Sequence, residues 1–95
     1  MVDSIRPLFS LGQCVATPGA LAALEEAAQT PADFLSRHVH GDWGTIHPAD
    51  KGMNEQAIRD GARIFSVYVT TKGAKLWVIT EADRDSTCIL LPDEY

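Results

Sequence analysis

The sequence predicts an α+β domain in which two or three short N-terminal helices pack on a three- or four-stranded antiparallel β-meander. The last third of the chain holds three runs rich in β-branched and aromatic residues, at 64–71, 74–80 and 87–91, with turn residues between them. The first half holds three X-Pro steps, each followed by helix-favouring residues. A length of 95 residues without a low-complexity linker indicates a single domain over residues 1–95.

The three X-Pro steps predict where the helices begin, because proline at the first helical position gives up no intrahelical hydrogen bond. They are Thr17-Pro18, Thr30-Pro31 and His47-Pro48. Thr30 also has an acid, Asp33, at the spacing of a capping box. Apolar spacing places the helices at residues 17–29, 32–39 and 49–60, and Gly41 and Gly61 follow the second and third as expected C-terminal caps.

The strands are predicted by alternation. In the run at 64–71, Phe65, Val67 and Val69 point one way and the residues between them point the other, and both faces are fairly apolar. The sheet is therefore expected to be covered on both sides, or to expose one face for recognition. Lys72-Gly73 supplies a turn into the second strand, residues 81–86 form a polar loop, and a further extended run at 9–15 could add a fourth strand at an edge.

Composition limits the class of function. Hydrophobic residues make up 45% of the chain, and no stretch is long and apolar enough to span a bilayer, so no membrane interaction is expected. Residues 1–6 show no secretory signal, and the cytoplasm is the expected location. Cys14 and Cys88 lie far apart without a redox spacing, so both are expected to be reduced thiols.

The net charge of −5 disfavours direct binding of nucleic acid, because the eight Lys and Arg residues form no basic cluster. Negative charge is concentrated near the C-terminus, where Arg84 is the single cation after residue 80. The acids there are Glu81, Asp83, Asp85, Asp93 and Glu94. The acids of the 81–86 loop are expected either to be solvated or to form a contact patch for a protein of opposite charge.

His38, His40 and Asp42, with His47 nearby, form the one cluster of metal-capable side chains in the sequence. The His-x-His-x-Asp order is an incomplete version of a binuclear metallohydrolase motif. The favoured interpretation is that the histidines end a helix, where a cation complements the helix dipole. No metal and no cofactor is therefore expected.

Two further groups of residues have more than one interpretation. Trp43, beside Asp42, is expected to cover the end of a sheet or to serve as an interface residue. His38 or His40 could join Arg63, Tyr68, Lys75 and Thr87 in an acid–base set of the kind that small ribonuclease toxins place on a sheet. The sequence has no Ser-His-Asp order and no glycine-rich phosphate loop.

Strings along nearly the whole chain are similar to those of one family. They are LGQ at 11–13, VATPGAL at 15–21, GDWG at 41–44, LWVITEADR at 76–84 and LLPDEY at 90–95. In these strings the chain resembles short bacterial proteins found on plasmids and integrative elements. The resemblance implies a mobile-element accessory, such as an anti-CRISPR or anti-restriction protein, and implies no catalytic residue.

The sequence therefore predicts a non-enzymatic protein-binding function, with an inhibitor of a bacterial defence complex as its concrete form. The acids listed above, together with Asp42, would dock on a basic surface of a nucleic-acid-binding complex, and Trp43, Tyr68 and Trp77 would supply the aromatic contacts. Two alternatives remain: a small histidine-dependent enzyme such as a ribonuclease, and a structural homodimer formed through an open sheet edge.

Overall fold

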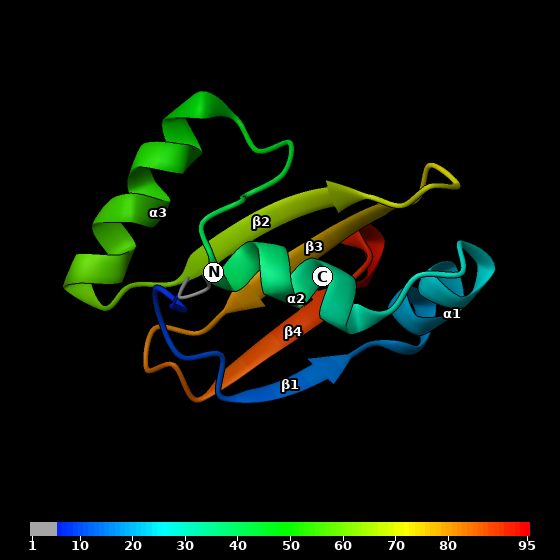
Figure 1. The fold of residues 1–95 in the computed structure, drawn as a ribbon, viewed down its shortest axis with the longest axis horizontal. Helices are drawn as coiled ribbons and strands as arrows, with labels where there is room; N and C mark the ends of the chain where they lie inside the picture. The colour runs from blue at the N-terminus through cyan, green and yellow to red at the C-terminus, as the bar shows by residue number, and fades with distance from the viewer. Residues whose placement is uncertain (1–5) are drawn as a thin grey trace.

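The computed structural model describes residues 6–95 and shows the α+β fold that the sequence predicts (Figure 1). Its elements in chain order are β1 (Gln13–Ala16), α1 (Pro18–Glu26), α2 (Pro31–Val39), α3 (Pro48–Asp60), β2 (Ile64–Val69), β3 (Lys75–Thr80), β4 (Ser86–Leu90) and the 3₁₀ helix η1 (Pro92–Glu94). Most of the segment in which no secretory signal is seen, residues 1–5, lies outside the described residues.

All three predicted helix starts are confirmed. Thr17 and Thr30 cap α1 and α2 with their hydroxyls, and the His47 ring nitrogen accepts from Ala49 N at 3.1 Å at the start of α3. The capping box of Thr30 and Asp33 is complete, because the Asp33 carboxylate also accepts from Thr30 N at 2.9 Å. Local backbone chemistry therefore sets where each helix begins.

The helix ends also follow local signals, with one difference. Gly61 ends α3 in the left-handed conformation with φ 73°, and Gly41 follows the cap of α2 with φ 87°. The first helix ends at Glu26 rather than near Gln29. Its last turn is replaced by Ala28 in the left-handed region with φ 56°, and Gln29 N bonds back to Leu24 O.

The sheet has the strand order β1-β4-β3-β2. The meander of β2, β3 and β4 is antiparallel as predicted, and the extended run before the first helix supplies an edge strand. One expectation was wrong: β1 runs parallel to β4, so the sheet is mixed rather than fully antiparallel. The three helices between β1 and β2 carry the chain from one edge of the sheet to the other, and this path sets the direction of β1, which local sequence does not encode.

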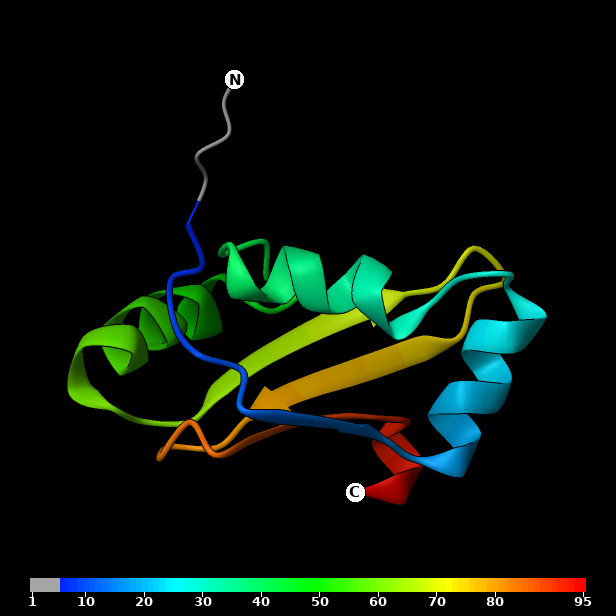
Figure 2. The same ribbon diagram turned by 60° about the horizontal axis from the view of Figure 1, so that its bottom comes forward.

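The helices cover one face of the sheet, and η1 lies against the other (Figure 2). α2 crosses the covered face, α1 stands at one end, and α3 runs beside β2 (Figures 1 and 2). The residues of the covered face alternate along the strands and are all buried. They are Ile64, Ser66, Tyr68, Leu76, Val78, Thr80, Thr87 and Ile89. Leu24 of α1 and Phe34 of α2 complete the main core, and Trp43 and Ala57 form a second cluster with Ile64.

Candidate functional site

The face of the sheet opposite the helices is the candidate functional surface. Its residues are Phe65, Val67 and Val69 of β2, Lys75, Trp77 and Ile79 of β3, Cys88 and Leu90 of β4, and Val15 of β1. Most of these side chains are apolar but only half-buried or exposed, in contrast to the other face. Of the two outcomes that the alternation allows, the structure shows a partly exposed face.

An aromatic cluster lies on this face. The ring of Trp77 contacts Phe65 edge-on, with centroids 5.2 Å apart and planes at 80°. Its other side meets Tyr95, with centroids 5.6 Å apart and planes at 66°. Such edge-to-face pairs are favourable geometry for aromatic rings. Tyr95 itself is 72% exposed, so the cluster presents an apolar surface with a polar hydroxyl at its border.

Arg63 holds Tyr95 in place. Its Nη1 donates to the Tyr95 hydroxyl at 3.1 Å, and its Nη2 donates to Glu81 Oε1 at 3.2 Å. The hydrogen bond with Tyr95, followed by that with Glu81, raises the pKa of Arg63. Both members of the Arg63–Glu81 ion pair are about half exposed, so the pair orients side chains more than it stabilises the fold.

The predicted acidic patch is divided between the two ends of β4. Asp83 and Asp85 lie in the turn before it, where Asp83 accepts from Asp85 N at 2.9 Å, and Asp93 and Glu94 lie in η1 after it. Asp93 is exposed. Asp83 and Asp85 therefore do not form one continuous surface with Asp93 and Glu94, because a five-residue strand separates the two pairs by roughly 17 Å.

Glu94 is engaged within the fold. Its carboxylate accepts hydrogen bonds from the Thr17 hydroxyl, from Gly19 N at 3.1 Å and from Leu91 N at 2.8 Å. These bonds, that of Thr17 first, lower the pKa of Glu94. The side chain thus ties η1 to the N-terminus of α1, where a negative charge is favourable.

Trp43 and Tyr68 are core residues, so the expectation that they are surface contacts is wrong, and of the two alternatives for Trp43 the structure supports the core one. They are 4% and 1% exposed, and both lie beneath the helices. The Tyr68 hydroxyl donates to Asp42 O at 2.5 Å, and burial raises its pKa to about 12. The sequence could not settle this, because both faces of β2 are apolar and only the position of α2 decides which one is covered.

Asp42 is exposed but paired. Its carboxylate accepts from Arg37 Nε at 2.7 Å and from Arg37 Nη2 at 3.3 Å, and it also accepts from Gly44 N. The Arg37 hydrogen bonds lower the pKa of Asp42. The residue therefore shapes the turn after α2, away from the aromatic face.

His38 is fully buried in a chain of hydrogen bonds whose directions can be worked out. Thr87 donates its one hydroxyl proton to Leu11 O at 2.7 Å. The 2.7 Å bond between the Thr87 and Thr80 hydroxyls must therefore have Thr80 as its donor. Thr80 in turn accepts from His38 Nε2 at 2.9 Å, which leaves His38 Nδ1 to accept from Ser66 at 2.6 Å. Burial lowers the pKa of His38 to about 4, and the ring is the neutral Nε2–H tautomer.

The prediction that the histidines end a helix is confirmed in position for His40, which is the C-cap of α2 and whose Nδ1 pairs with Ser36 O at 2.7 Å. His38 lies in the last turn of α2 but is neutral, so it offers no charge to the helix dipole, and His47 caps the start of α3. Within residues 6–95, no group of three metal-capable side chains comes together. Within residues 6–95, His38 and His40 form no hydrogen bond with Arg63, Tyr68 or Lys75, and Thr87 reaches His38 only through Thr80, so the acid–base set is not assembled.

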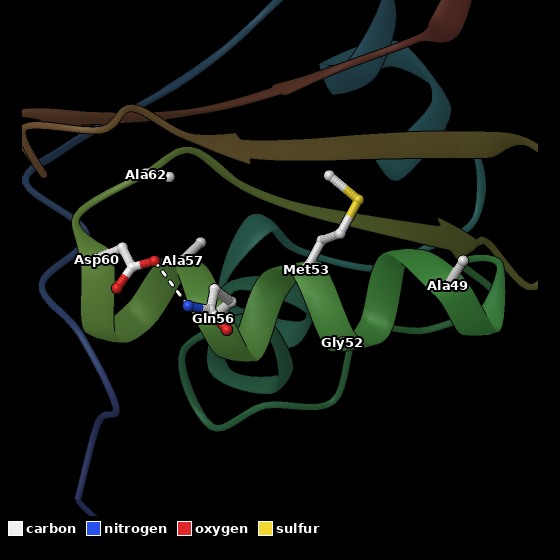
Figure 3. Close-up of a pocket in the computed structure, with 7 residues that line it drawn as sticks. All are labelled: Ala49, Gly52, Met53, Gln56, Ala57, Asp60 and Ala62. Carbon is white, nitrogen blue, oxygen red and sulfur yellow. Dashed lines mark hydrogen bonds between the residues drawn. The ribbon is translucent and has the colours of Figure 1, made fainter.

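A surface pocket of about 450 Å³ lies along α3 (Figure 3). It is lined by Ala49, Gly52, Met53, Gln56, Ala57, Asp60 and Ala62. Of these lining residues, Asp60 alone is ionisable, and its carboxylate accepts from Gln56 Nε2 at 2.8 Å. A single carboxylate without an acid or base partner offers no catalytic constellation.

Three residues of this surface, Phe65, Tyr95 and Arg63, are not among the contact residues that the sequence predicts. The alternation along β2 places Phe65 on the same face as Val67 and Val69, so a sequence signal for Phe65 exists. Tyr95 and Arg63 meet across the sheet only because η1 folds beneath it, and no local pattern indicates that contact.

Comparison with family models, curated proteins and solved structures finds no match to this chain. None of the helices within residues 6–95 has the length and apolar composition needed to cross a bilayer. The function must therefore be argued from the surface itself.

Proposed function

We propose that this protein is a non-enzymatic binding protein whose partner docks on the open face of the sheet. The observation that carries the proposal is the half-exposed aromatic cluster of Phe65, Trp77 and Tyr95. Trp and Tyr dominate the binding energy of protein interfaces, since they bury large areas at a low cost in conformational entropy. Among the aromatic residues predicted as contacts, Trp77 keeps that role.

The partner surface is proposed to be basic. The chain carries a net charge of −5. Glu81 directly follows strand β3, and Asp93 lies in η1, which borders the aromatic cluster. Arg63, which is paired with Glu81, and Lys75 also border the cluster, so the net negative charge of the whole chain is what would speed encounter with a basic surface. A nucleic-acid-binding defence complex offers such a surface, which supports the proposal of an anti-CRISPR or anti-restriction inhibitor on a mobile element.

The test begins with capture of a partner from bacterial lysate on the immobilised protein, followed by binding measurements with the purified partner. Tyr95→Ala and Trp77→Ala should each weaken binding by at least about 10-fold, as expected for central aromatic residues. Leu8→Ala is the control, because Leu8 is also an exposed apolar side chain but lies beside the end of α2, away from this face. Circular dichroism checks that each variant folds.

Charge is tested separately. Asp93→Lys should slow association and flatten its dependence on salt, and Asp83→Lys at the far end of β4 should have a smaller effect. Equal affinity of the wild type and both aromatic variants for the partner would refute the proposed surface. Recovery of an ordinary cytoplasmic enzyme instead of a nucleic-acid-binding protein would refute the proposed class of partner.

A further inference from the structure

The two edge strands of the sheet differ in whether their outward-facing backbone groups are hydrogen-bonded. At the outer edge of β2, the Asn54 side chain donates to Phe65 O at 2.7 Å and accepts from Phe65 N at 3.0 Å. The next outward-facing residue is also paired, since Val67 N bonds to Trp43 O at 3.1 Å and Thr45 N bonds to Val67 O at 2.7 Å. The backbone groups of Phe65 and Val67 are therefore not available to pair with a further strand.

The outer edge of β1 is open. Gln13 N bonds to Asp85 O and Thr17 N bonds to Ile89 O, each at 3.0 Å. In a parallel ladder alternate residues face the partner strand, so Gln13, Val15 and Thr17 face β4 while Cys14 and Ala16 turn their backbone groups outward. No backbone hydrogen bond to these two residues is found from within the described part of the chain. Figure 1 shows β1 as the outermost strand on that side.

The side chains along this edge suit strand pairing. Val15 is 45% exposed on the open face, and Leu21 is 49% exposed beside the other face. A shallow pocket of about 230 Å³ lies there, lined by Cys14, Val15, Ala16, Leu21, Pro31, Leu35 and Ile89, all of them uncharged. The strand itself carries no lysine, proline or bulge, which are the usual devices that keep an edge from pairing.

We propose that β1 pairs with β1 of a second copy of this chain in antiparallel orientation. Because the outward residues are Cys14 and Ala16, a two-fold axis beside Val15 sets Cys14 opposite Ala16 of the second copy. Each of these two symmetry-related pairs exchanges two backbone hydrogen bonds, which gives four in all. Val15 then faces Val15 of the other copy as a close, non-hydrogen-bonded pair.

Charge favours a second copy as the occupant. Two chains of net charge −5 repel each other over most of their surfaces, but the lining of this edge is uncharged and apolar, so repulsion is smallest there. The pairing is self-complementary, as a two-fold interface requires. A strand of four residues makes a small contact, and small contacts are weak and transient, with a dissociation constant expected at about 10 to 1,000 µM.

The dimer would contain one continuous eight-stranded sheet. The two-fold axis stands perpendicular to the sheet, so both aromatic clusters lie on the same side. This arrangement goes beyond the proposed binding function, because it presents two docking surfaces to a partner at once. Bivalent presentation raises the apparent affinity without adding any contact to either surface.

Sedimentation equilibrium up to about 1 mM protein tests the association. The average mass should rise from 10.3 kDa toward twice that value. Val15→Lys should keep the protein monomeric, since it places like charges directly opposite each other. Val69→Lys is the matched control, because Val69 is 47% exposed on the same face but beside the capped strand edge. A monomeric wild type at 1 mM, or equal masses for the two variants, would overturn the proposal.

Crosslinking tests the register. In a Cys14→Ser, Cys88→Ser background, Val15→Cys should form an intermolecular disulfide, because the opposed Cα atoms would lie about 4.5 Å apart. Val69→Cys in the same background is the control. The single variant Cys88→Ser retains Cys14, whose Cα atoms would be about 8 Å apart in the dimer, too far for a disulfide. Crosslinking through Cys14 that matches or exceeds that through Val15→Cys contradicts this register.

Discussion

Lowering the pH should destabilise this protein through His38 before Asp42 and Glu94, whose pKa values are lowered, are protonated. The ring is fully buried and neutral, and its pKa in the fold is about 4, against 6.5 in the unfolded chain. Below pH 6.5 the unfolded chain therefore binds a proton that the folded chain does not. The free energy of unfolding must fall as the pH falls through this window.

The size of the effect follows from the two pKa values. Each unit of difference between folded and unfolded pKa corresponds to about 1.4 kcal/mol. Because protonation of the unfolded chain is gradual, the loss between about pH 7.5 and about pH 5 amounts to roughly 2 kcal/mol. Glu94 and Asp42 have lowered pKa values, so the stability that they contribute is present above their unfolded values and lost below about pH 4.5.

Urea unfolding at several pH values, followed by far-ultraviolet circular dichroism, measures this loss. His38→Gln should cost about 1 to 3 kcal/mol at neutral pH, because Ser66 loses its acceptor, but the slope between pH 7.5 and 5 should nearly vanish. His40→Gln is the control, since that ring is exposed. A slope that survives in His38→Gln, or a wild type whose stability is flat over this range, would refute the proposed neutral network.

Two further predictions concern backbone groups that side chains satisfy. Arg84 donates to Ala57 O at 2.9 Å and to Ala62 O at 2.7 Å, so Arg84→Lys should cost about 2 kcal/mol in urea unfolding, because an ammonium lacks the planar fork. Arg59→Lys, exposed on α3, should cost little, and equal losses would contradict this role of Arg84. Asn54→Ala should cost about 2 to 3 kcal/mol, since both backbone groups of Phe65 lose their partners. It should also cause association at the newly opened edge, visible by light scattering, whereas Glu55→Ala should not; a monodisperse Asn54→Ala protein would argue against the capping role.

Much of the fold could be predicted from the sequence because it depends on neighbouring residues. The starts of the helices at Thr17, Thr30 and His47 follow from cap geometry and proline, and Gly61 ends α3 because it accepts a positive φ. Alternation likewise placed Phe65 and Tyr68 on opposite faces of one strand.

The candidate site was predicted less well. Of the proposed aromatic contacts Trp77 lies on the exposed face, whereas Trp43 and Tyr68 are core residues, and the acids divide between two ends of β4. Composition and charge place no residue in space, so they could not separate an acid that caps a helix, such as Glu94, from one free to meet a partner.

The sequence by itself determined the types and order of the helices and of the meander strands, and where each helix begins, because those depend on dihedral preferences and hydrogen bonds within a few residues. Only the tertiary structure decided that β1 runs parallel to β4, that the helices cover the Tyr68 face, and that His38 is sealed among hydroxyls. Each of these outcomes depends on contacts between segments that are far apart in the chain. The two faces of β2 are similarly apolar, so only the packing of the helices decides which of them is covered.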